Sequence, residues 1–455
     1  MSGLAAGIRL AHFGKKVCIF ERHYAPGGLN SFYSKDGRKF DVGLHAMTNF
    51  VKPGVKGTPL GKILRQLRIP REELDLSEQK RSRIAFTDAD LSFSNDFSLL
   101  ESEVARVFPK EVDGFRKLSD EIRSYPDVKL DEAYVSARSV VRNWISDPLL
   151  EDMIFCPLMY YGSATEADMD FSQFVVMFRS IFLEGFARPL DGIRKMIRLL
   201  LDRYRSAGGI RRMRTGISRI ETEGNRVSRL VLDSGEEVEA DFVLSSAGLP
   251  ETFRLIDSEL DRDFASKEGQ LSFTETISIF DKQPSEFEWS DDAIVFFNHG
   301  TKFAYQRSAD PVDLRSGVIC IPNNFDYGDR TLAEGVVRVT CLADYDHWTQ
   351  YEEDQYIEAK EEWNDRIWES AVQFMPKSDL NYDNDRVAWD MFTPKTVERY
   401  TWHARGAIYG SPSKLKDGKT AYSNLFLCGT DQGYLGIIGS MLSGIAMANQ
   451  HVLRG

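Results

Sequence analysis

The chain has 455 residues, 42% of them hydrophobic and 28% charged, which is the composition of a globular protein long enough for two or more domains. A net charge of −12 and the absence of a basic tail exclude nucleic acid as a partner, because binding it requires clustered Lys and Arg. Neither a signal peptide nor an apolar run long enough to span a bilayer is recognisable, so we expect a cytoplasmic protein.

The residue types of hydrolytic and metal-dependent sites are not arranged for those chemistries. The sequence contains no HExxH, no metal-spaced cluster of His and Cys and no Ser/His/Asp pattern. Its five cysteines lie far apart without a CxxC pair, and we expect them to be reduced and buried: Cys18, Cys156, Cys320, Cys341 and Cys428.

The first forty-five residues predict a helix, a strand, a glycine turn and a second extended segment. Gly3, Gly7 and Gly14 give the helix a thin face and a stop. "KKVCIFE" is nearly all apolar, which is typical of an interior parallel strand covered on both faces. "APGGLNS" then predicts a loop, and "FDVGLHAM" an extended piece.

The remainder alternates between helical and extended character. Residues 50–205 predict mostly helices, 209–247 several short strands with hairpin turns at "EGN" and "SGE", and 270–345 a larger antiparallel sheet. A charged helix over 346–372 follows, and the last sixty residues predict a strand, a glycine loop and an uncharged helix. Because no flexible linker separates these parts, the domains are expected to be interleaved in sequence.

The segment 171–186, "FSQFVVMFRSIFLEGF", is rich in phenylalanine at mixed helical spacing. The simpler interpretation is a helix of the hydrophobic core. The alternative is a wall or mouth of an apolar substrate tunnel.

The opening segment matches the second half of a dinucleotide-binding unit. In such a unit a strand delivers G-x-G-x-x-G to a helix N-terminus, and an acid about 20 residues later binds ribose hydroxyls. Gly3 takes the place of the third glycine and Glu21 that of the acid, whereas the first strand and two glycines are not in the sequence. We therefore expect the given start to be internal to a longer reading frame or a truncation.

Several separated blocks resemble the FAD-dependent phytoene desaturase superfamily, which includes carotenoid isomerases and retinol saturases and is related to the amine oxidases. These blocks are "GLAAGIRLAHFGKKVCIFERHYAPGG", "GRKFDVGLHAMT", "GFARPLDGIRKMIRLLLDRYRSAGGIRRMRTGISRI", "NRVSRLVLDSGEEVEADFVLSSAG", "TPKTVERYTWHARGAIYGSP" and "NLFLCGTDQGYLGIIGSMLSGIAMA". The third has Asp191-Gly192 where the family has two glycines. His45 is similar to retinol-saturase-like members, and the tail lacks the proline typical of phytoene desaturases.

The resemblance implies a set of FAD-binding residues and two candidate catalytic residues. Glu21 would bind the ribose, Ile217 would lie beside the adenine, and Asp431 would meet the ribityl or pyrophosphate part. A helix N-terminus at Gly436–Gly439 would stabilise negative charge on the reduced flavin. The cofactor-binding candidates are Gly3, Glu21, Arg22, Gly27, Gly28, Asp41, Ile217, Gly429, Asp431, Gly436, Ile437 and Gly439, and the catalytic candidates at the flavin face are His45 and Tyr409.

Some of these residues have a purely structural alternative. His45 is equally compatible with a buried histidine whose hydrogen bonds are satisfied, and Asp41 with a residue that orders its own loop. The glycine-rich turn before the last helix could serve core packing alone.

The predicted fold is α/β, a Rossmann-like FAD-binding domain interleaved with an α+β substrate domain. Residues 1–50, 205–265 and 385–455 would form the FAD-binding domain, and residues 51–204 and 266–384 the substrate domain.

The resemblance implies a hydrophobic polyene substrate, with desaturation, isomerisation and saturation all open. Reaching such a substrate would involve peripheral membrane contact through local hydrophobic docking, since the net charge disfavours anionic lipids. Two alternatives remain: a flavin amine oxidase, and a non-enzymatic escort protein that holds a prenyl or lipid group on the same fold. The oligomeric state is not fixed by the sequence.

Overall fold

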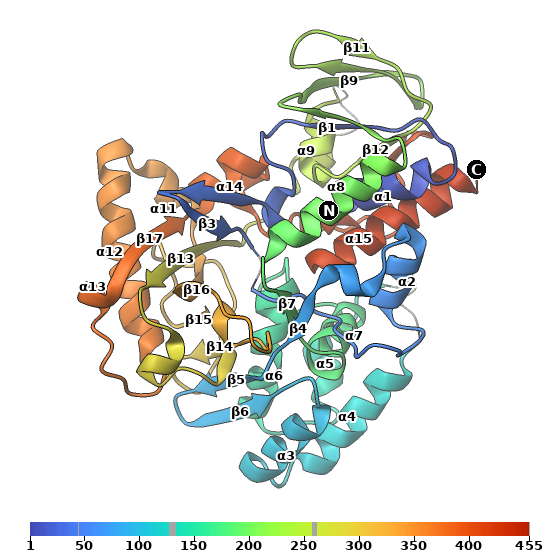
Figure 1. Ribbon diagram of the computed structural model, residues 1–455. Coiled ribbons are helices and arrows are strands. Elements are labelled where there is room, and N and C mark those ends of the chain that lie inside the picture. Colours follow the sequence, from blue (N-terminus) through green and yellow to red (C-terminus); the bar gives the residue numbers. More distant parts are fainter. Residues whose placement is uncertain (44, 127–132, 257–261, 455) are drawn as a thin grey trace.

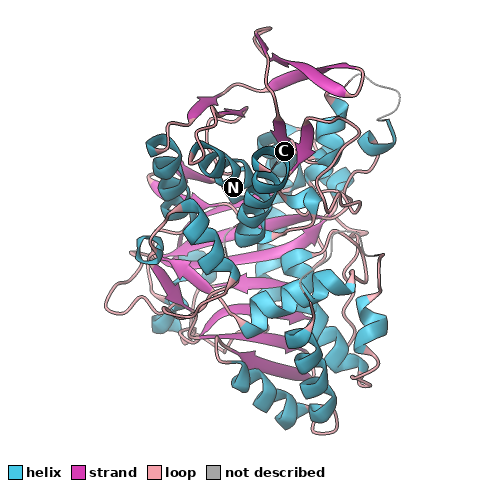
Figure 2. Cartoon of the chain, turned by 90° about the vertical axis from the view of Figure 1, so that its right-hand side faces the viewer, coloured by secondary structure: helices cyan, strands magenta, loops and turns pink. Residues whose placement is uncertain are grey.

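The computed structural model describes residues 1–43, 45–126, 133–256 and 262–454 as a mixed α/β protein (Figure 1). Viewed from the side, strands run across the molecule with helices flanking them (Figure 2). Within these residues no helix is long and apolar enough to cross a membrane.

The first and last long helices, α1 (Ser2–Ala11) and α15 (Gly436–Met447), pack against each other. A Cβ on Gly444 would lie 2.1 Å from the Ser2 carbonyl oxygen, so only glycine allows this approach. Helices α2 (Pro59–Leu67) and α8 (Ile193–Ser206) share the same hydrophobic core. On α1 itself, a Cβ on Gly7 would lie 2.8 Å from the Tyr204 ring of α8 and 3.1 Å from Ile19 Cδ1, so the glycine face predicted for the opening helix meets both a helix and a strand.

Two short parallel strand pairs lie beside these helices. β1 (Cys18–Glu21) pairs with β8 (Ile210–Met213), and β12 (Val243–Ser245) pairs with β18 (Leu425–Leu427). The prediction of an interior β1 covered on both faces is wrong in this structure, because β1 pairs on one side only among the described strands and its residues are exposed or half-buried. Cys18 is exposed for the same reason, whereas the other four cysteines are buried as predicted.

The turns predicted at "EGN" and "SGE" are confirmed. β9 (Ile217–Glu223), β10 (Arg226–Leu232) and β11 (Glu237–Val238) form a three-stranded antiparallel sheet, seen at the top of Figure 1. Gly224 and Gly235 provide the positive φ that these tight turns require.

A seven-stranded sheet, in the order β17-β13-β16-β15-β14-β5-β6, forms the centre of the other half. The antiparallel sheet predicted over 270–345 is confirmed by β13 (Ser272–Phe280), β14 (Asp292–Asn298), β15 (Ser316–Cys320) and β16 (Gly335–Ala343). The prediction that 50–205 is mostly helical missed β5 (Arg81–Phe86) and β6 (Ala89–Phe93), which extend this sheet, and β17 (Arg386–Phe392) closes its other edge.

The two faces of this sheet are covered by different helices, because successive side chains along a strand point to opposite faces. Ile294 and Phe296 of β14 pack in one core with α6 (Pro148–Gly162) and α7 (Phe171–Phe178). Val295 and Phe297 pack in another core with α12 (Glu353–Val372), which follows α11 (Tyr345–Gln350) after a break at Tyr351.

The aromatic segment 171–186 belongs to the first of these cores. α7 continues into one π-helical turn, Arg179–Leu183, and all its phenylalanines are buried. The core interpretation of this segment is confirmed.

The remaining helices and strands are shorter connections around these layers. The helices are α3 (Phe97–Val107), α4 (Val112–Ser124), α5 (Ala137–Val141), α9 (Leu249–Arg254), α10 (Arg262–Ala265), α13 (Tyr382–Asp385) and α14 (Pro394–Thr401). The strands are β2 (Phe32–Lys35), β3 (Arg38–Asp41), β4 (Leu76–Glu78) and β7 (Ala187–Pro189).

Candidate functional site

The loop that follows β1 carries an acid and a glycine pair. Glu21 ends the strand, and its Oε1 accepts a hydrogen bond from the His23 backbone N–H at 3.0 Å. Gly27 has φ 121°, and a Cβ there would lie 2.8 Å from Ile197 Cδ1. Gly28 has φ 58° and no atom within 4 Å of a Cβ position, so its backbone borders open space. The loop can therefore admit a ligand close to its main chain.

The structure brings Arg22 and Ile217 together. Arg22 donates to the Ile217 carbonyl oxygen at 2.6 Å and forms an ion pair with Asp233 at 2.9 Å. Its guanidinium also lies 3.5 Å from the centre of the Trp402 ring. Ile217 is thus held next to the Glu21 loop through its backbone.

The starts of α1 and α15 have no side-chain cap. Unpaired N–H groups at a helix N-terminus attract anions and partial negative charge. Gly436 opens α15 at φ 70° with nothing within 4 Å of a Cβ position, whereas a Cβ on Gly439 would lie 2.9 Å from the Tyr434 backbone. Ile437 is buried beneath this turn. The α15 N-terminus is therefore tightly packed on one side and open on the other.

The start of α1 contacts Gly429, the residue before the turn that carries Asp431. A Cβ on Gly429 would lie 2.9 Å from Ser2 Oγ. A Cβ on Gly3 would make an ordinary contact with Ser246 at 3.6 Å. The α1 N-terminus thus lies beside segments from two distant parts of the sequence, around Ser246 and Gly429.

The carboxylate of Asp431 is occupied by protein donors. Its oxygens accept from the backbone N–H groups of Leu249 at 2.6 Å and Ser411 at 2.9 Å, and from Lys414 Nζ at 3.1 Å. A Cβ on Gly410 would lie 2.2 Å from Asp431 Oδ1. In this structure Asp431 therefore ties three segments together beside the α15 N-terminus.

These features fit FAD. The structure offers an acid for a ribose at Glu21, uncapped N-termini at α1 and α15 for the pyrophosphate and flavin, and open glycine backbone at Gly28 and Gly436. Asp431 would support the cofactor by fixing the surrounding turns.

A second, buried polar centre is formed at the end of β3. Asp41 pairs with Arg188 at 2.7 Å and Arg194 at 3.3 Å, and also accepts from the Ile193 N–H that begins α8. A Cβ on Gly192 would lie 1.9 Å from the Asp41 carboxylate, so glycine is required where the family has its glycine pair. Asp41 thus orders this junction.

His45 lies in the same centre, opposite the large sheet. Its Nε2 is 2.8 Å from Glu275 Oε2 on β13 and 2.9 Å from Thr340 Oγ1 on β16. The Glu275 Oε1 accepts from Arg338 Nε at 2.5 Å, and both of these side chains are 2% accessible. A histidine that the chain places in a loop is therefore anchored by two strands more than 200 residues away.

Electrostatics fixes the charges of this centre. Burial lowers the pKa of His45 and outweighs the attraction of Glu275, so the imidazole is neutral near pH 7. Burial alone would raise the pKa of Glu275, but the charge of Arg338 and the contact with His45 hold it at about 2. Glu275 is therefore an ionised carboxylate that only accepts hydrogen bonds.

Apolar side chains with residual accessible surface lie beside this centre. The Tyr161 ring is 6.3 Å from the His45 ring and packs on Phe186 and Phe296 at 5.3 and 5.4 Å. Tyr409 donates to the Tyr160 carbonyl oxygen at 2.5 Å. Burial raises the pKa of both tyrosines, so both are neutral phenols. Tyr161 and Tyr409 are both half-buried and pack on the core of the large sheet, and we call this pair the apolar wall.

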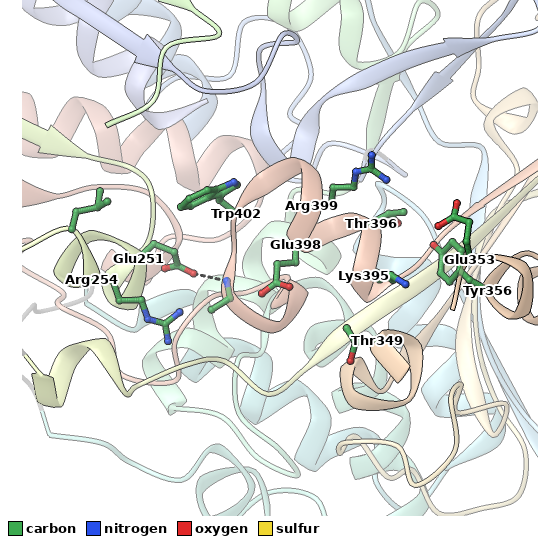
Figure 3. A pocket seen from close by; sticks show the side chains of 12 residues that line it. Glu251, Arg254, Thr349, Glu353, Tyr356, Lys395, Thr396, Glu398, Arg399 and Trp402 are labelled. Carbon is green, nitrogen blue, oxygen red and sulfur yellow. Dashed lines mark hydrogen bonds between the residues drawn. The ribbon is translucent and has the colours of Figure 1, made fainter. Parts of the chain in front are cut away.

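A cleft of about 730 Å³ opens between α9, α11, α12 and α14 (Figure 3). Glu251 is one of its lining residues: Oε1 accepts from the Ala404 N–H at 2.7 Å, and Oε2 is buried without a hydrogen-bond partner among the described residues. Trp402 links the cleft to Arg22. Its lining consists of Glu251, Arg254, Leu255, Thr349, Glu353, Tyr356, Lys395, Thr396, Glu398, Arg399, Trp402 and Ala404, none of which was a candidate from the sequence.

Glu275, Arg338, Thr340 and Tyr161 escaped the sequence analysis, although they surround His45. One signal was available: "FTETISIF" places a glutamate in the middle of a strand that is buried along its whole length. A buried charge implies a partner, but the sequence does not reveal that the partners are on β16 and in the loop after β3.

Comparison with known proteins gives a consistent result. A family model described as flavin containing amine oxidoreductase matches residues 1–451. The chain is 23% identical to an all-trans-retinol 13,14-reductase of Danio rerio over 97% of this chain and 82% of that protein. It is 22% identical to a prolycopene isomerase of an Oncidium hybrid cultivar, over 99% and 82%. For a lycopene-forming phytoene desaturase of Pantoea ananas the identity is 23% over 55% of each chain.

Solved structures show the same fold over nearly the whole length. An oxidoreductase from Methanosarcina mazei aligns with TM-score 0.67 and 15% identity, covering 99% of this chain and 98% of that one. A putrescine oxidase aligns with TM-score 0.64 and 14% identity, covering 100% and 97%. A Rab GDI from Plasmodium falciparum aligns with TM-score 0.51 and 11% identity, covering 98% and 95%.

Proposed function

Because the chain belongs to the family of flavin containing amine oxidoreductases, we propose that it is an FAD-dependent enzyme that desaturates, isomerises or saturates a hydrophobic polyene of the carotenoid or retinoid type. The family membership makes it a flavoprotein oxidoreductase. The polyene substrate is supported by relatives that align with nearly all of this chain over 82% of their own length and whose names specify retinol and prolycopene.

FAD, when bound, supplies the hydride acceptor or donor. Glu21 would bind its adenosine ribose, with Arg22 and the Ile217 backbone alongside, and the N-termini of α1 and α15 would face its charged and polar parts. Asp41 and Gly192 hold β3 against the start of α8, which fixes the loop that carries His45. The role of these residues is to position groups and to exclude water.

The observation that carries the proposal is the apolar wall beside the polar centre. An extended hydrocarbon gains about 25 cal/mol for each Å² that it removes from water, and it needs few polar contacts. Tyr409, a catalytic candidate, would contribute its ring to this wall and not its hydroxyl, which is already bonded to Tyr160.

The charge of the centre disfavours the amine oxidase alternative. Three guanidinium groups, those of Arg188, Arg194 and Arg338, face two carboxylates, those of Asp41 and Glu275, while His45 is neutral. This leaves one net positive charge in a buried site, which would repel an ammonium substrate. A neutral polyene experiences no such penalty.

The test is reconstitution of the chain with FAD, followed by anaerobic incubation of the oxidised form and, separately, of the dithionite-reduced form with three substrates: a retinoid, a phytoene-type carotenoid and putrescine. The proposal predicts an altered polyene spectrum and product by chromatography, and no reaction with putrescine. Turnover of putrescine alone would establish the amine oxidase. A protein that binds the polyene but no FAD would establish the escort protein.

A further inference from the structure

We propose that His45 Nδ1 is the base that removes a proton from the substrate carbon, and that Glu275 and Thr340 are positioning residues that fix the imidazole for this task. The inference rests on the proposed function and narrows it towards desaturation. His45 alone was a candidate from the sequence; the two positioning residues and the atom that acts come from the structure.

The hydrogen-bond network determines which nitrogen of His45 carries the proton. Glu275 is ionised and therefore only accepts, so Thr340 donates its hydroxyl hydrogen to Glu275 Oε2 at 2.8 Å. With that hydrogen committed, both neighbours of His45 Nε2 present lone pairs, at 2.8 and 2.9 Å. The neutral imidazole is therefore protonated at Nε2, and Nδ1 bears the free lone pair.

That lone pair is available. Within the described part of the chain, no group forms a hydrogen bond with His45 Nδ1. Nδ1 is not among the fully buried atoms that lack a partner, so it keeps some accessible surface. The side chain keeps 12% of its surface accessible, although Glu275 behind it keeps 2%. His45 thus meets the sheet through Nε2, and its ring centre lies 6.3 Å from that of Tyr161.

The arrangement follows the logic of a carboxylate–imidazole pair in enzymes that use histidine as a base. The carboxylate selects the tautomer and stabilises the imidazolium that forms when Nδ1 takes a proton. Arg338 holds the carboxylate ionised from the other side. Arg338 therefore sets the charge of Glu275, and Glu275 sets the orientation of His45.

The step balances as a dehydrogenation. One C–H bond of the substrate loses its proton to Nδ1, the neighbouring C–H bond loses hydride to the oxidised cofactor that the family supplies, and the electrons of the first bond form the C=C bond. A base that is neutral near pH 7 suits removal of a proton, whereas saturation would need a protonated donor at the same atom. The charge state of His45 is thus the reason that desaturation is favoured.

The variants that test the inference are Glu275→Gln, Thr340→Val and His45→Gln, with Thr276→Val as the matched control. Thr276 is a threonine on β13, next to Glu275, and its buried hydroxyl has no partner among the described residues, so its removal alters no hydrogen-bond network. Glu275→Asp tests rescue by a shorter carboxylate.

The first readout is the histidine ¹⁵N NMR spectrum of the FAD-loaded protein, which reports tautomer and pKa independently of turnover. The signal of His45 is the one that His45→Gln removes from the seven histidines. We expect the Nε2–H tautomer in the wild type and the control, loss of that fixed tautomer in Glu275→Gln, and partial recovery in Glu275→Asp. An Nδ1–H tautomer in the wild type, or no change in Glu275→Gln, would overturn the inference.

The second readout is the pH dependence of kcat/KM for polyene desaturation. The charged and titratable groups that face His45 from the surrounding elements are Glu275, Arg338, Arg188, Tyr161, Cys320 and Asp41. The pKa of Glu275 is lowered to about 2, whereas the pKa values of Arg338, Tyr161 and Cys320 are raised, so these four do not titrate between pH 6 and 8. The value of kcat/KM should fall at acidic pH as His45 is protonated, which gives the pH profile an acidic limb. His45→Gln should lower kcat/KM at least 100-fold. Glu275→Gln should lower it at least tenfold and shift the acidic limb to lower pH. An unmoved limb contradicts the inference; a correct tautomer with no polyene turnover contradicts only the proposed function.

Discussion

Replacement of Arg338 by methionine would measure how strongly the buried centre depends on its charge balance. Arg338 Nε lies 2.5 Å from Glu275 Oε1, and each side chain keeps 2% of its surface. Removing the guanidinium leaves an ionised carboxylate buried with His45 and Thr340 as its remaining partners among the described residues. Loss of one member of a buried ion pair costs about 3–5 kcal/mol, whereas replacing both members by apolar residues is often neutral. We therefore expect Arg338→Met to cost about 3–5 kcal/mol, and Arg338→Met with Glu275→Leu to recover most of it.

The assay is urea unfolding followed by tryptophan fluorescence, with the free energy of unfolding obtained by linear extrapolation. The matched control is Arg205→Met, which removes an exposed i,i+3 pair with Asp202 whose side chains keep 77% and 58% of their surface. The control should cost less than about 0.5 kcal/mol. If Arg338→Met costs no more than Arg205→Met, or if the double variant is less stable than the single one, the account of a buried charged centre is refuted.

Four further predictions follow from individual residues. Burial lowers the pKa of His45, so below about pH 6.5 the unfolded chain binds more protons at this residue than the folded chain does. The free energy of unfolding should therefore fall from pH 7.5 to pH 5.5 more in the wild type than in His45→Gln. Equal pH slopes in the two proteins would contradict the lowered pKa. Gly444→Leu should lower stability by about 1–3 kcal/mol in urea unfolding, since its side chain would enter the Ser2 backbone, and a tolerated leucine would argue against the close packing of α1 on α15. Glu21→Gln should raise the Kd for FAD about tenfold or more in flavin fluorescence titrations, and an unchanged Kd would remove Glu21 from the cofactor site. One thiol, Cys18, should react rapidly with a disulfide reagent because it is exposed, and more slowly at neutral pH than above pH 9 because partial desolvation raises its pKa. Cys18→Ser should abolish the fast phase, and several fast thiols would contradict the burial of the other four.

Local chemistry explains what the sequence could predict. The glycines at 224 and 235 specify hairpin turns through their positive φ, and those at 3, 7 and 14 specify a thin helix with a stop, so the elements around them could be placed correctly. The alternation in residues 270–345 likewise gave the antiparallel sheet. The proposed division into FAD-binding and substrate domains stays a prediction, and α2 and α8 share a core with α1 and α15 although the prediction assigned both to the substrate side.

Long-range pairing explains what was missed. β5 and β6 are short strands between helices, and their place in the sheet depends on β14, which lies more than 200 residues later in the sequence. The exposure of β1 depends on how many neighbouring strands pair with it, and the apolar composition of β1 does not encode that number. The partners of His45 are separated from it by 230 and 295 residues, so only the folded sheet brings them together. The sequence could therefore nominate His45 but not decide between a structural and a catalytic role.

The central claim is that this chain binds FAD and uses it on a polyene, and one anaerobic experiment tests it directly. The FAD-loaded protein is mixed with a phytoene-type carotenoid, and the oxidised-flavin absorbance and the polyene spectrum are recorded together. We predict that the flavin band bleaches while the conjugated polyene absorbance grows in equal molar amounts, and that His45→Gln slows both changes alike. If the protein retains FAD but its flavin band stays unchanged with every polyene, the claim that the chain uses FAD on a polyene is contradicted.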